Sequence, residues 1–304
     1  MSMYLGSSDM DVSRIGLGCM RMAELPDSEV ERVVGSALDN GITLFDHADI
    51  YGGGASEEKF GRLLAGSRGL RDKMRIQSKC GICEGYYDLS AKHIIEAVEG
   101  SLKRLRTDYL DLLLLHRPDA LMVPDEIADA FSSLEQSGKV LAFGVSNFNT
   151  MQISMLQSEL SQPLVANQLQ FGLGHTQMIS SGICTNTGLL GAVDRDGYVL
   201  DYCRMRDITV QAWSPLQYGL FEGTIFDKEK FPKLNEVLSA FARRYDVTEA
   251  MIAIAWILKH PANMQVLIGT MKPEHIRDLC RADGLELTRQ EWYELYLAAG
   301  NDLP

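Results

Sequence analysis

Three polar side chains end predicted strands, and a tyrosine follows one of them in the next loop. Asp46 follows the run Leu44-Phe45, His116 follows four consecutive leucines, and Lys79 ends the β-branched and polar stretch from residue 74. Tyr51 lies five residues beyond Asp46. A charged side chain in partly dry surroundings needs a partner or a task, so these residues are candidates for chemistry.

This set of side chains suits the reduction of a carbonyl group, because the developing alkoxide needs a proton donor. Free tyrosine, with a pKa of about 10, is a weak donor at neutral pH. We expect Lys79 to lower the pKa of Tyr51, Asp46 to hold Lys79 charged, and His116 to orient the carbonyl by a hydrogen bond. The scheme requires no metal. From spacing alone, a structural Asp46–Lys79 ion pair, a core His116 and a loop Tyr51 explain the residues equally well.

The elements that would position these residues alternate along the whole chain. Short apolar runs predict eight strands, separated by amphipathic stretches that predict helices, as where Val30, Val33, Val34, Ala37 and Leu38 share one face. Ser90 has the position of a helix cap, and Thr288 with Glu291 has the spacing of a capping box. The predicted strands are residues 14–18, 43–46, 74–79, 109–116, 140–146, 164–168, 208–213 and 265–268.

This alternation predicts an α/β fold, a (β/α)₈ TIM barrel formed by residues 1–304 as a single domain. An open doubly wound sheet is the alternative. Residues 3–13 are expected to form a β-hairpin under the barrel floor, with its turn at residues 7–9. The long connections 171–200 and 215–235 follow strands, so we expect them at the C-terminal barrel face and involved in function.

Composition excludes several classes of protein. The formal net charge of −12 argues against nucleic acid as a partner. No apolar run is long enough to cross a bilayer and the N-terminus does not resemble a signal peptide, so we expect a cytoplasmic protein without a membrane partner. The six cysteines are expected to be free thiols, although Cys80 and Cys83 form a C-x-x-C pair. Rossmann, P-loop, zinc-protease and G-x-S-x-G motifs are absent.

Several ordered motifs resemble the aldo-keto reductase family, in particular its bacterial branch of YdhF-type oxidoreductases. The resemblance begins with the stretch 41–52, GITLFDHADIYG, and the acidic residues Glu57 and Glu58 that follow it. It continues through QSK at 77–79, DYLDL at 108–112, HRP at 116–118, GVSNF at 144–148, NQ at 167–168 and AWSPL at 212–216. These motifs span nearly the whole chain.

The resemblance implies an NADP(H)-dependent oxidoreductase that reduces aldehydes or ketones to alcohols. Asp46, Tyr51, Lys79 and His116 would be its catalytic tetrad, with Tyr51 as general acid in reduction and general base in oxidation. Ser146, Asn147 and Gln168 would hold the carboxamide, Trp213 would stack on the nicotinamide, and Ser214 to Leu216 would follow the pyrophosphate. The implied cofactor-binding residues are Gly18, Met20, Arg21, Ser146, Asn147, Gln168, Trp213, Ser214, Pro215, Leu216, Gly269, Met271, Lys272, His275 and Asp278.

The expected 2'-phosphate site, residues 268–278, departs from the family pattern. His275 stands where many members have arginine, and Leu279 stands where many have asparagine. Lys272 or Arg277 would have to supply the positive charge. The resemblance therefore implies NADP(H), with NAD(H) use open.

Two other functions remain open. An NADP-binding regulatory or redox-sensing subunit would have the same fold, with Cys80 and Cys83 as a switch. A barrel lyase or isomerase would use Lys79 as a Schiff base, which needs a lowered lysine pKa. The carbonyl substrate and the oligomeric state are not readable. Five residues suggest an apolar pocket: Phe171, Leu173, Tyr218, Phe221 and Trp292.

Overall fold

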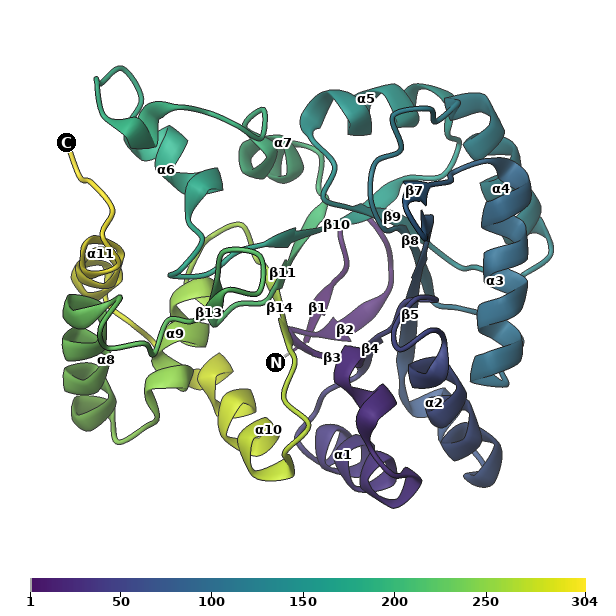
Figure 1. Cartoon of the computed structure of the whole chain (residues 1–304), viewed down its shortest axis with the longest axis horizontal. Coiled ribbons are helices and arrows are strands. Elements are labelled where there is room, and N and C mark those ends of the chain that lie inside the picture. Colours follow the sequence, from purple (N-terminus) through teal and green to yellow (C-terminus); the bar gives the residue numbers. More distant parts are fainter. Residues whose placement is uncertain (1) are drawn as a thin grey trace.

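Eight parallel strands close into a barrel at the centre of the molecule (Figure 1). The computed structural model describes residues 2–304. The neighbour order around the barrel is β10-β11-β14-β3-β4-β5-β8-β9. Every predicted strand is present, and closure of the barrel excludes the open sheet. The barrel strands are β3 (Ile15–Gly18), β4 (Leu44–Asp46), β5 (Arg75–Cys80), β8 (Leu112–Leu115), β9 (Phe143–Ser146), β10 (Leu164–Gln170), β11 (Thr209–Trp213) and β14 (Gln265–Ile268).

Helices surround the barrel and cover its outer face (Figure 1). They are α1 (Asp27–Asp39), α2 (Ala55–Gly66), α3 (Ala91–Leu105), α4 (Pro124–Gln136), α5 (Thr150–Glu159), α6 (Gln177–Ile183), α7 (Val199–Met205), α8 (Pro232–Tyr245), α9 (Glu249–Leu258), α10 (Pro273–Cys280) and α11 (Arg289–Ala298). Short 3-10 turns are η1 (Met20–Glu24), η2 (Arg71–Lys73), η3 (Leu190–Ala192) and η4 (Arg281–Gly284). None of the helices in residues 2–304 is long and apolar enough to cross a membrane.

The predicted helix faces and caps are confirmed. In α1 the side chains of Val30, Val33, Val34 and Ala37 are buried, whereas Leu38 is half-buried. Ser90 caps α3 by accepting a hydrogen bond from the His93 amide, and Thr288 and Glu291 form a reciprocal capping box at α11. These caps satisfy backbone amides that the first helical turn leaves free.

The predicted N-terminal hairpin lies under the barrel. Strand β1 (Ser2–Tyr4) pairs antiparallel with β2 (Asp11–Ser13), and Leu5 in the connecting turn is fully buried. Leu5 packs in one cluster with Leu44, Leu112 and Leu114, which come from barrel strands. The hairpin therefore closes the end of the barrel opposite to the strand C-termini.

The two long connections contain structure of their own. Residues 171–200 include α6 and η3, and this segment packs on the C-terminal tail through a hydrogen bond from Thr176 to Asn301. Residues 215–235 form a small hairpin of β12 (Gln217–Tyr218) and β13 (Gly223–Thr224) before α8 begins. A third hairpin, β6 (Ile82–Cys83) with β7 (Tyr86–Tyr87), follows β5.

Candidate active site

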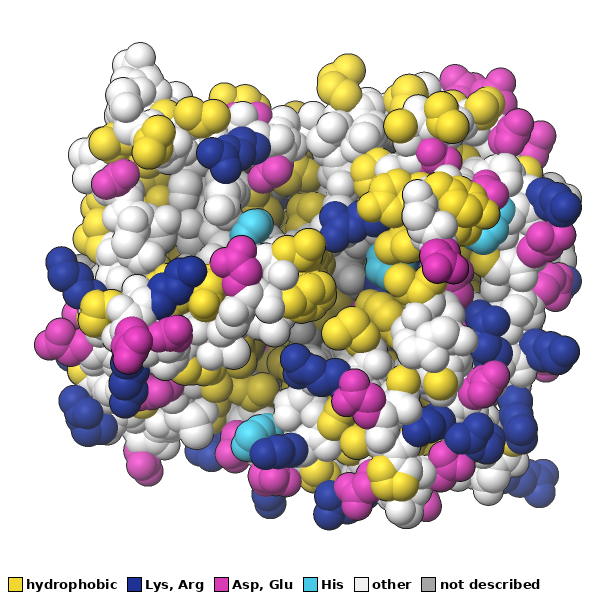
Figure 2. Space-filling model, viewed as in Figure 1, with side chains coloured by type: hydrophobic (Ala, Val, Ile, Leu, Met, Phe, Trp, Pro, Cys, Tyr) yellow, Lys and Arg dark blue, Asp and Glu magenta, His cyan; other side chains and the backbone are white. Residues whose placement is uncertain are grey.

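A cavity of about 550 Å³ lies where the carboxyl ends of the barrel strands meet. Figure 2 shows the molecule hollowed near the centre of this face, with hydrophobic, basic and histidine side chains around the hollow. Its walls come from the strand ends, from the β12–β13 connection and from the segment after β14. Sites of TIM barrels lie at this end because loops from all strands converge there.

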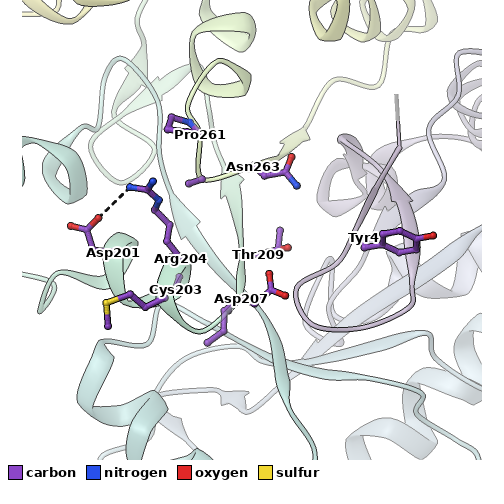
Figure 3. Close-up of a pocket in the computed structure, with 11 residues that line it drawn as sticks. Tyr4, Asp201, Cys203, Arg204, Asp207, Thr209, Pro261 and Asn263 are labelled. Atoms are coloured by element: carbon purple, nitrogen blue, oxygen red, sulfur yellow. Dashed lines mark ion pairs between the residues drawn. The ribbon is translucent and has the colours of Figure 1, made fainter.

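A second cavity, of about 650 Å³, lies near the opposite end of the barrel (Figure 3). It is lined by Tyr4 of the N-terminal hairpin, by residues that precede β11 and by Asn263, which precedes β14. Within it Arg204 pairs with Asp201 at 3.5 Å. None of the four catalytic candidates lines this cavity, so we place the candidate active site at the other end.

The four catalytic candidates lie together at the C-terminal mouth. The Nζ atom of Lys79 is 2.7 Å from Asp46 Oδ1 and 3.0 Å from the Tyr51 hydroxyl, and it also donates to the His47 carbonyl at 2.7 Å. The rings of Tyr51 and His116 are 6.0 Å apart at nearly right angles. Tyr51, His116 and Asp46 line the cavity, and Lys79 is buried behind them.

The electrostatic balance at Tyr51 differs from the sequence expectation. Burial raises the pKa of Tyr51 above its usual value, and the nearby Lys79 ammonium lowers it by less. Lys79 thus lowers the pKa of Tyr51 as expected, but the net shift is upward because loss of hydration outweighs the effect of the ion. Burial also disfavours the charged form of Lys79, but Asp46 and Tyr51 raise the pKa of Lys79 overall. A charged Lys79 disfavours the Schiff-base alternative.

His116 is a neutral side chain in this site. Burial, followed by the charges of Lys79 and Arg117, lowers the pKa of His116 to about 2. Its Nδ1 atom is buried without a hydrogen-bond partner in residues 2–304. A neutral imidazole of this kind can donate one hydrogen bond to a bound oxygen without adding a charge.

The residues expected to hold a nicotinamide form one hydrogen-bonded chain along the cavity wall. Trp213 donates from Nε1 to Asn147 at 3.3 Å, Asn147 donates to Ser146 at 2.8 Å, and Ser146 donates to the Gln168 carbonyl at 3.1 Å. Asn147 and Ser214 have positive φ values of 62° and 47°. Side chains other than glycine adopt this conformation at a cost, which marks both strand ends as specialised.

The remaining cofactor candidates divide into two groups. Gly18, Met20, Arg21 and Gly269 line the cavity together with Pro215 and Leu216, and Arg21 spans from η1 to β14 by donating to the Gly269 carbonyl at 3.0 Å. Met271, Lys272, His275 and Asp278 do not line it. They lie just before or on α10, where Lys272 and His275 are exposed.

Sequence reasoning missed a buried network of glutamines beneath the tetrad. Gln211 donates to Gln77 and to Gln265, both at 2.8 Å. Gln77 and Gln168 both donate to Asp46 Oδ1. These amides fill the barrel interior and fix the carboxylate of Asp46. The sequence signal that could have revealed them is a glutamine within each of four predicted strands.

Sequence reasoning also missed a group of buried ionisable residues near the start of α2. Glu57 on α2 is fully buried, where it pairs with Arg104 of α3 at 2.7 Å and accepts from Ser78 at 2.6 Å. Asp49 lies nearby, and its Oδ1 is buried without a partner in the described chain. Burial and the charge of Glu57 raise the pKa of Asp49 to about 7.

The expected apolar pocket residues are mostly core. Phe171 and Leu173 are buried, and Trp292 stacks on Trp256 at 4.8 Å between the ring centroids. Only Phe221 of the five suggested residues lines the cavity. Residues 171–200 contribute nothing to its walls, whereas the 215–235 connection contributes Leu216, Gln217, Phe221, Thr224 and Phe226. Of the two long connections, only 215–235 lines the cavity.

The six cysteines are free thiols. Cys80 is buried and Cys83 is half-buried in the hairpin that follows β5. No group of metal-ligating side chains was found in residues 2–304.

Comparison with known proteins identifies the family of this chain. The sequence model of the Aldo/keto reductase family matches residues 14–296. The chain is 37% identical to oxidoreductase YdhF of Escherichia coli, with 97% of this chain and 96% of that protein covered, and 36% identical to a 6-dehydroglucose reductase of Agrobacterium fabrum, with 98% of each covered. The structure of an aldo-keto reductase from Klebsiella pneumoniae in complex with NADPH superposes with a TM-score of 0.77 at 25% identity, over 98% of this chain and 95% of that one. The chain is therefore a member of the aldo/keto reductase family of oxidoreductases.

Proposed function

We propose that this protein is an NADP(H)-dependent reductase that converts aldehyde or ketone carbonyls to alcohols, with Tyr51 as the general acid. The observation that carries the proposal is the placement of Lys79, whose ammonium contacts both Asp46 and the Tyr51 hydroxyl at the wall of the cavity. A buried charge partner beside a titratable group in a cavity is typical of functional sites.

The residues around the cavity fit a nicotinamide cofactor. Ser146, Asn147 and Gln168 offer hydroxyl and amide groups along one wall, and the half-buried ring of Trp213 stands beside them. A flat ring that carries a carboxamide needs these partners. The buried Nδ1 atom of His116, which has no hydrogen-bond partner among residues 2–304, is a further polar atom at the same mouth.

When bound, the reduced nicotinamide supplies the hydride to the carbonyl carbon. Tyr51 donates its hydroxyl proton to the carbonyl oxygen, so that hydride and proton together make the alcohol. The raised pKa of Tyr51 keeps this proton in place until the alkoxide develops. Lys79 then stabilises the phenolate left on Tyr51, Asp46 holds Lys79 charged, and neutral His116 orients the carbonyl oxygen. In the reverse direction the Tyr51 phenolate accepts the alcohol proton.

Cofactor choice depends on the exposed cations beside the cavity. We expect Lys272 at the start of α10 to meet a 2'-phosphate, because that helix N-terminus also offers free backbone amides. The A. fabrum relative is named a 6-dehydroglucose reductase, and the K. pneumoniae structure is a complex with NADPH. Both facts support a carbonyl substrate and a phosphorylated cofactor for this chain.

The experiment is a titration of the purified protein with NADPH and NADH, followed by a panel of aldehydes and ketones with the better cofactor. We expect tighter binding of NADPH, and about a tenfold loss of NADPH affinity in Lys272→Met with little change for NADH. Equal affinity for both cofactors in the wild type would contradict the NADP(H) assignment. Tight binding without turnover of any carbonyl would favour the regulatory alternative instead, and a Cys80→Ser, Cys83→Ser variant would then test the thiol switch.

A further inference from the structure

Arg117 is a charged side chain of the cavity wall that the proposed mechanism does not use. It follows His116 directly after β8, it is half-buried, and it lines the cavity. Within residues 2–304 its guanidinium makes no hydrogen bond and no ion pair. Its charge acts on the neighbouring His116, whose pKa it helps to lower. A partly dry guanidinium without a counter-charge costs free energy, so a ligand is the expected partner.

The cavity itself cannot supply that partner. Among the described residues that line it, Asp46 is the one carboxylate, and its Oδ1 atom is already bound to Lys79. The other lining guanidinium, Arg21, donates to the Gly269 carbonyl. Among the described residues that line the cavity, Arg117 is thus the one cation whose side chain makes no hydrogen bond or ion pair.

The phosphates of the cofactor are also expected away from Arg117. In the closed barrel β8 is four strands from β14 in either direction, so the two strands lie opposite one another. The expected phosphate-binding residues follow β11 and β14, at Ser214–Leu216 and residues 269–278. An anion that reaches Arg117 therefore belongs to the substrate.

Beside these polar groups, part of the cavity wall is apolar. Ile50 and Ile82 line the cavity after β4 and β5, and the rings of Trp213 and Phe221 are 6.2 Å apart on the other side. Such walls accept an apolar body, and one guanidinium suits a planar anion with two oxygens, because its donors form a matching fork.

The backbone around Arg117 is held in place before any ligand arrives. Pro118 restricts the preceding residue to extended conformations. Asp119 accepts hydrogen bonds from the Leu121 amide at 2.8 Å and from the Leu89 amide at 3.2 Å, which ties this loop to the start of α3. Fixing the main chain in this way lowers the entropic cost of binding.

We propose that Arg117 binds a carboxylate on the substrate, so that this enzyme prefers apolar aldehydes or ketones that carry a carboxylate group. The inference rests on the proposed carbonyl reduction and adds the substrate class. It makes Arg117 a specificity residue and gives it no part in proton or hydride transfer.

The test compares para-formylbenzoate with its methyl ester as substrates in the presence of NADPH. We measure the ratio of kcat/KM for the acid to kcat/KM for the ester in the wild type, in Arg117→Met and in Arg117→Lys. Dividing one enzyme's ratio by another's cancels the different intrinsic reactivities of the two aldehydes. We expect the ratio to fall at least tenfold in Arg117→Met, mainly through KM of the acid, and by an intermediate amount in Arg117→Lys, which keeps the charge but not the fork.

The control variant is Arg68→Met, which removes an exposed cation that does not line the cavity and changes the net charge equally. Its ratio should equal that of the wild type. A ratio in Arg117→Met within twofold of the wild type, or an equal fall in Arg68→Met, would overturn the inference.

Binding of the product gives a readout that does not require turnover. Quenching of tryptophan fluorescence by para-(hydroxymethyl)benzoate and by its methyl ester reports both affinities. Loss of the preference for the acid in Arg117→Met supports the inference even if the proposed reduction fails, and an unchanged preference contradicts it. Absence of turnover with both aldehydes and all enzymes would count against the proposed function alone.

Discussion

At the scale of single residues, the site depends on one buried cation with three oxygen partners. Lys79 contacts Asp46, Tyr51 and the His47 carbonyl, and it is fully enclosed by protein. The sequence predicted that these residues meet, because residue type and strand-end position suffice for that. The sequence did not predict that the pKa of Tyr51 is raised, because this depends on how much water the folded chain excludes from the hydroxyl.

Asp49 provides a prediction about stability and pH. The pKa of this carboxyl is raised to about 7 by burial and Glu57, so the folded state holds its proton more tightly than the unfolded state does. Stability is therefore lost as the pH rises from the ordinary aspartate range through about 7, and it is not regained above that. Asp49→Asn removes this loss, and we expect on the order of 2 kcal/mol higher free energy of unfolding at about pH 8 and no gain near pH 4.

Urea unfolding at both pH values checks this expectation. Asp196→Asn is a control on a more solvated aspartate whose pKa is also raised by burial and a neighbouring acid. An equal effect of Asp49→Asn at both pH values would show that folding does not raise the pKa of this carboxyl.

At the scale of elements, strands place the reacting groups and helices hold the loops between them. The loop that carries Tyr51 is bonded to the first turn of α2, since the amides of Gly54 and Ser56 both donate to the Tyr51 carbonyl at 3.2 Å. The strands and their order along the chain could be read from local apolar patterns. The glutamine network could not, because Gln211 and Gln77 meet across 134 residues of sequence and no local signal pairs them.

Close packing of α2 on α3 gives a test at this scale. A Cβ atom on Gly61 of α2 would lie 2.0 Å from the main-chain oxygen of Arg104, so Gly61→Ala must push the helices apart. We expect a loss of about 1–3 kcal/mol in stability and weaker turnover, because α2 also fixes the Tyr51 loop. Gly35→Ala in α1 meets no atom within 4 Å and should stabilise by about 0.5–1 kcal/mol. Thermal melting separates the two, and equal shifts would contradict the packing argument.

At the scale of the whole molecule, the N-terminal hairpin and the candidate active site lie at opposite ends of one barrel. The N-terminal hairpin seals the floor, and the cavity opens at the other end. The fold was predictable because its repeated strand–helix pattern leaves few alternatives. The cavity walls were harder to predict from the sequence. Only the tertiary arrangement buries Phe171 and Trp292 in the core and places Arg117 in the cavity wall.

Because the two ends are separate, we expect a substitution in the N-terminal hairpin to lower stability without changing substrate binding. Leu5 is fully buried against Leu44 and Leu112, so Leu5→Ala should cost about 2–5 kcal/mol of stability. Well below its melting temperature the variant should keep the KM values of the wild type, because no wall of the cavity changes. Melting curves and steady-state kinetics check both halves. A large change in KM would mean that the two ends of the barrel are coupled.

In the proposed mechanism, Tyr51 protonates the carbonyl oxygen during hydride transfer. Its most direct test is a single-turnover measurement of NADPH oxidation by wild type and by Tyr51→Phe, with a reactive aldehyde and with NADPH binding measured separately. We expect Tyr51→Phe to bind NADPH with wild-type affinity and to transfer hydride about 10²–10⁴ times more slowly. An unchanged rate of hydride transfer in Tyr51→Phe would contradict the account.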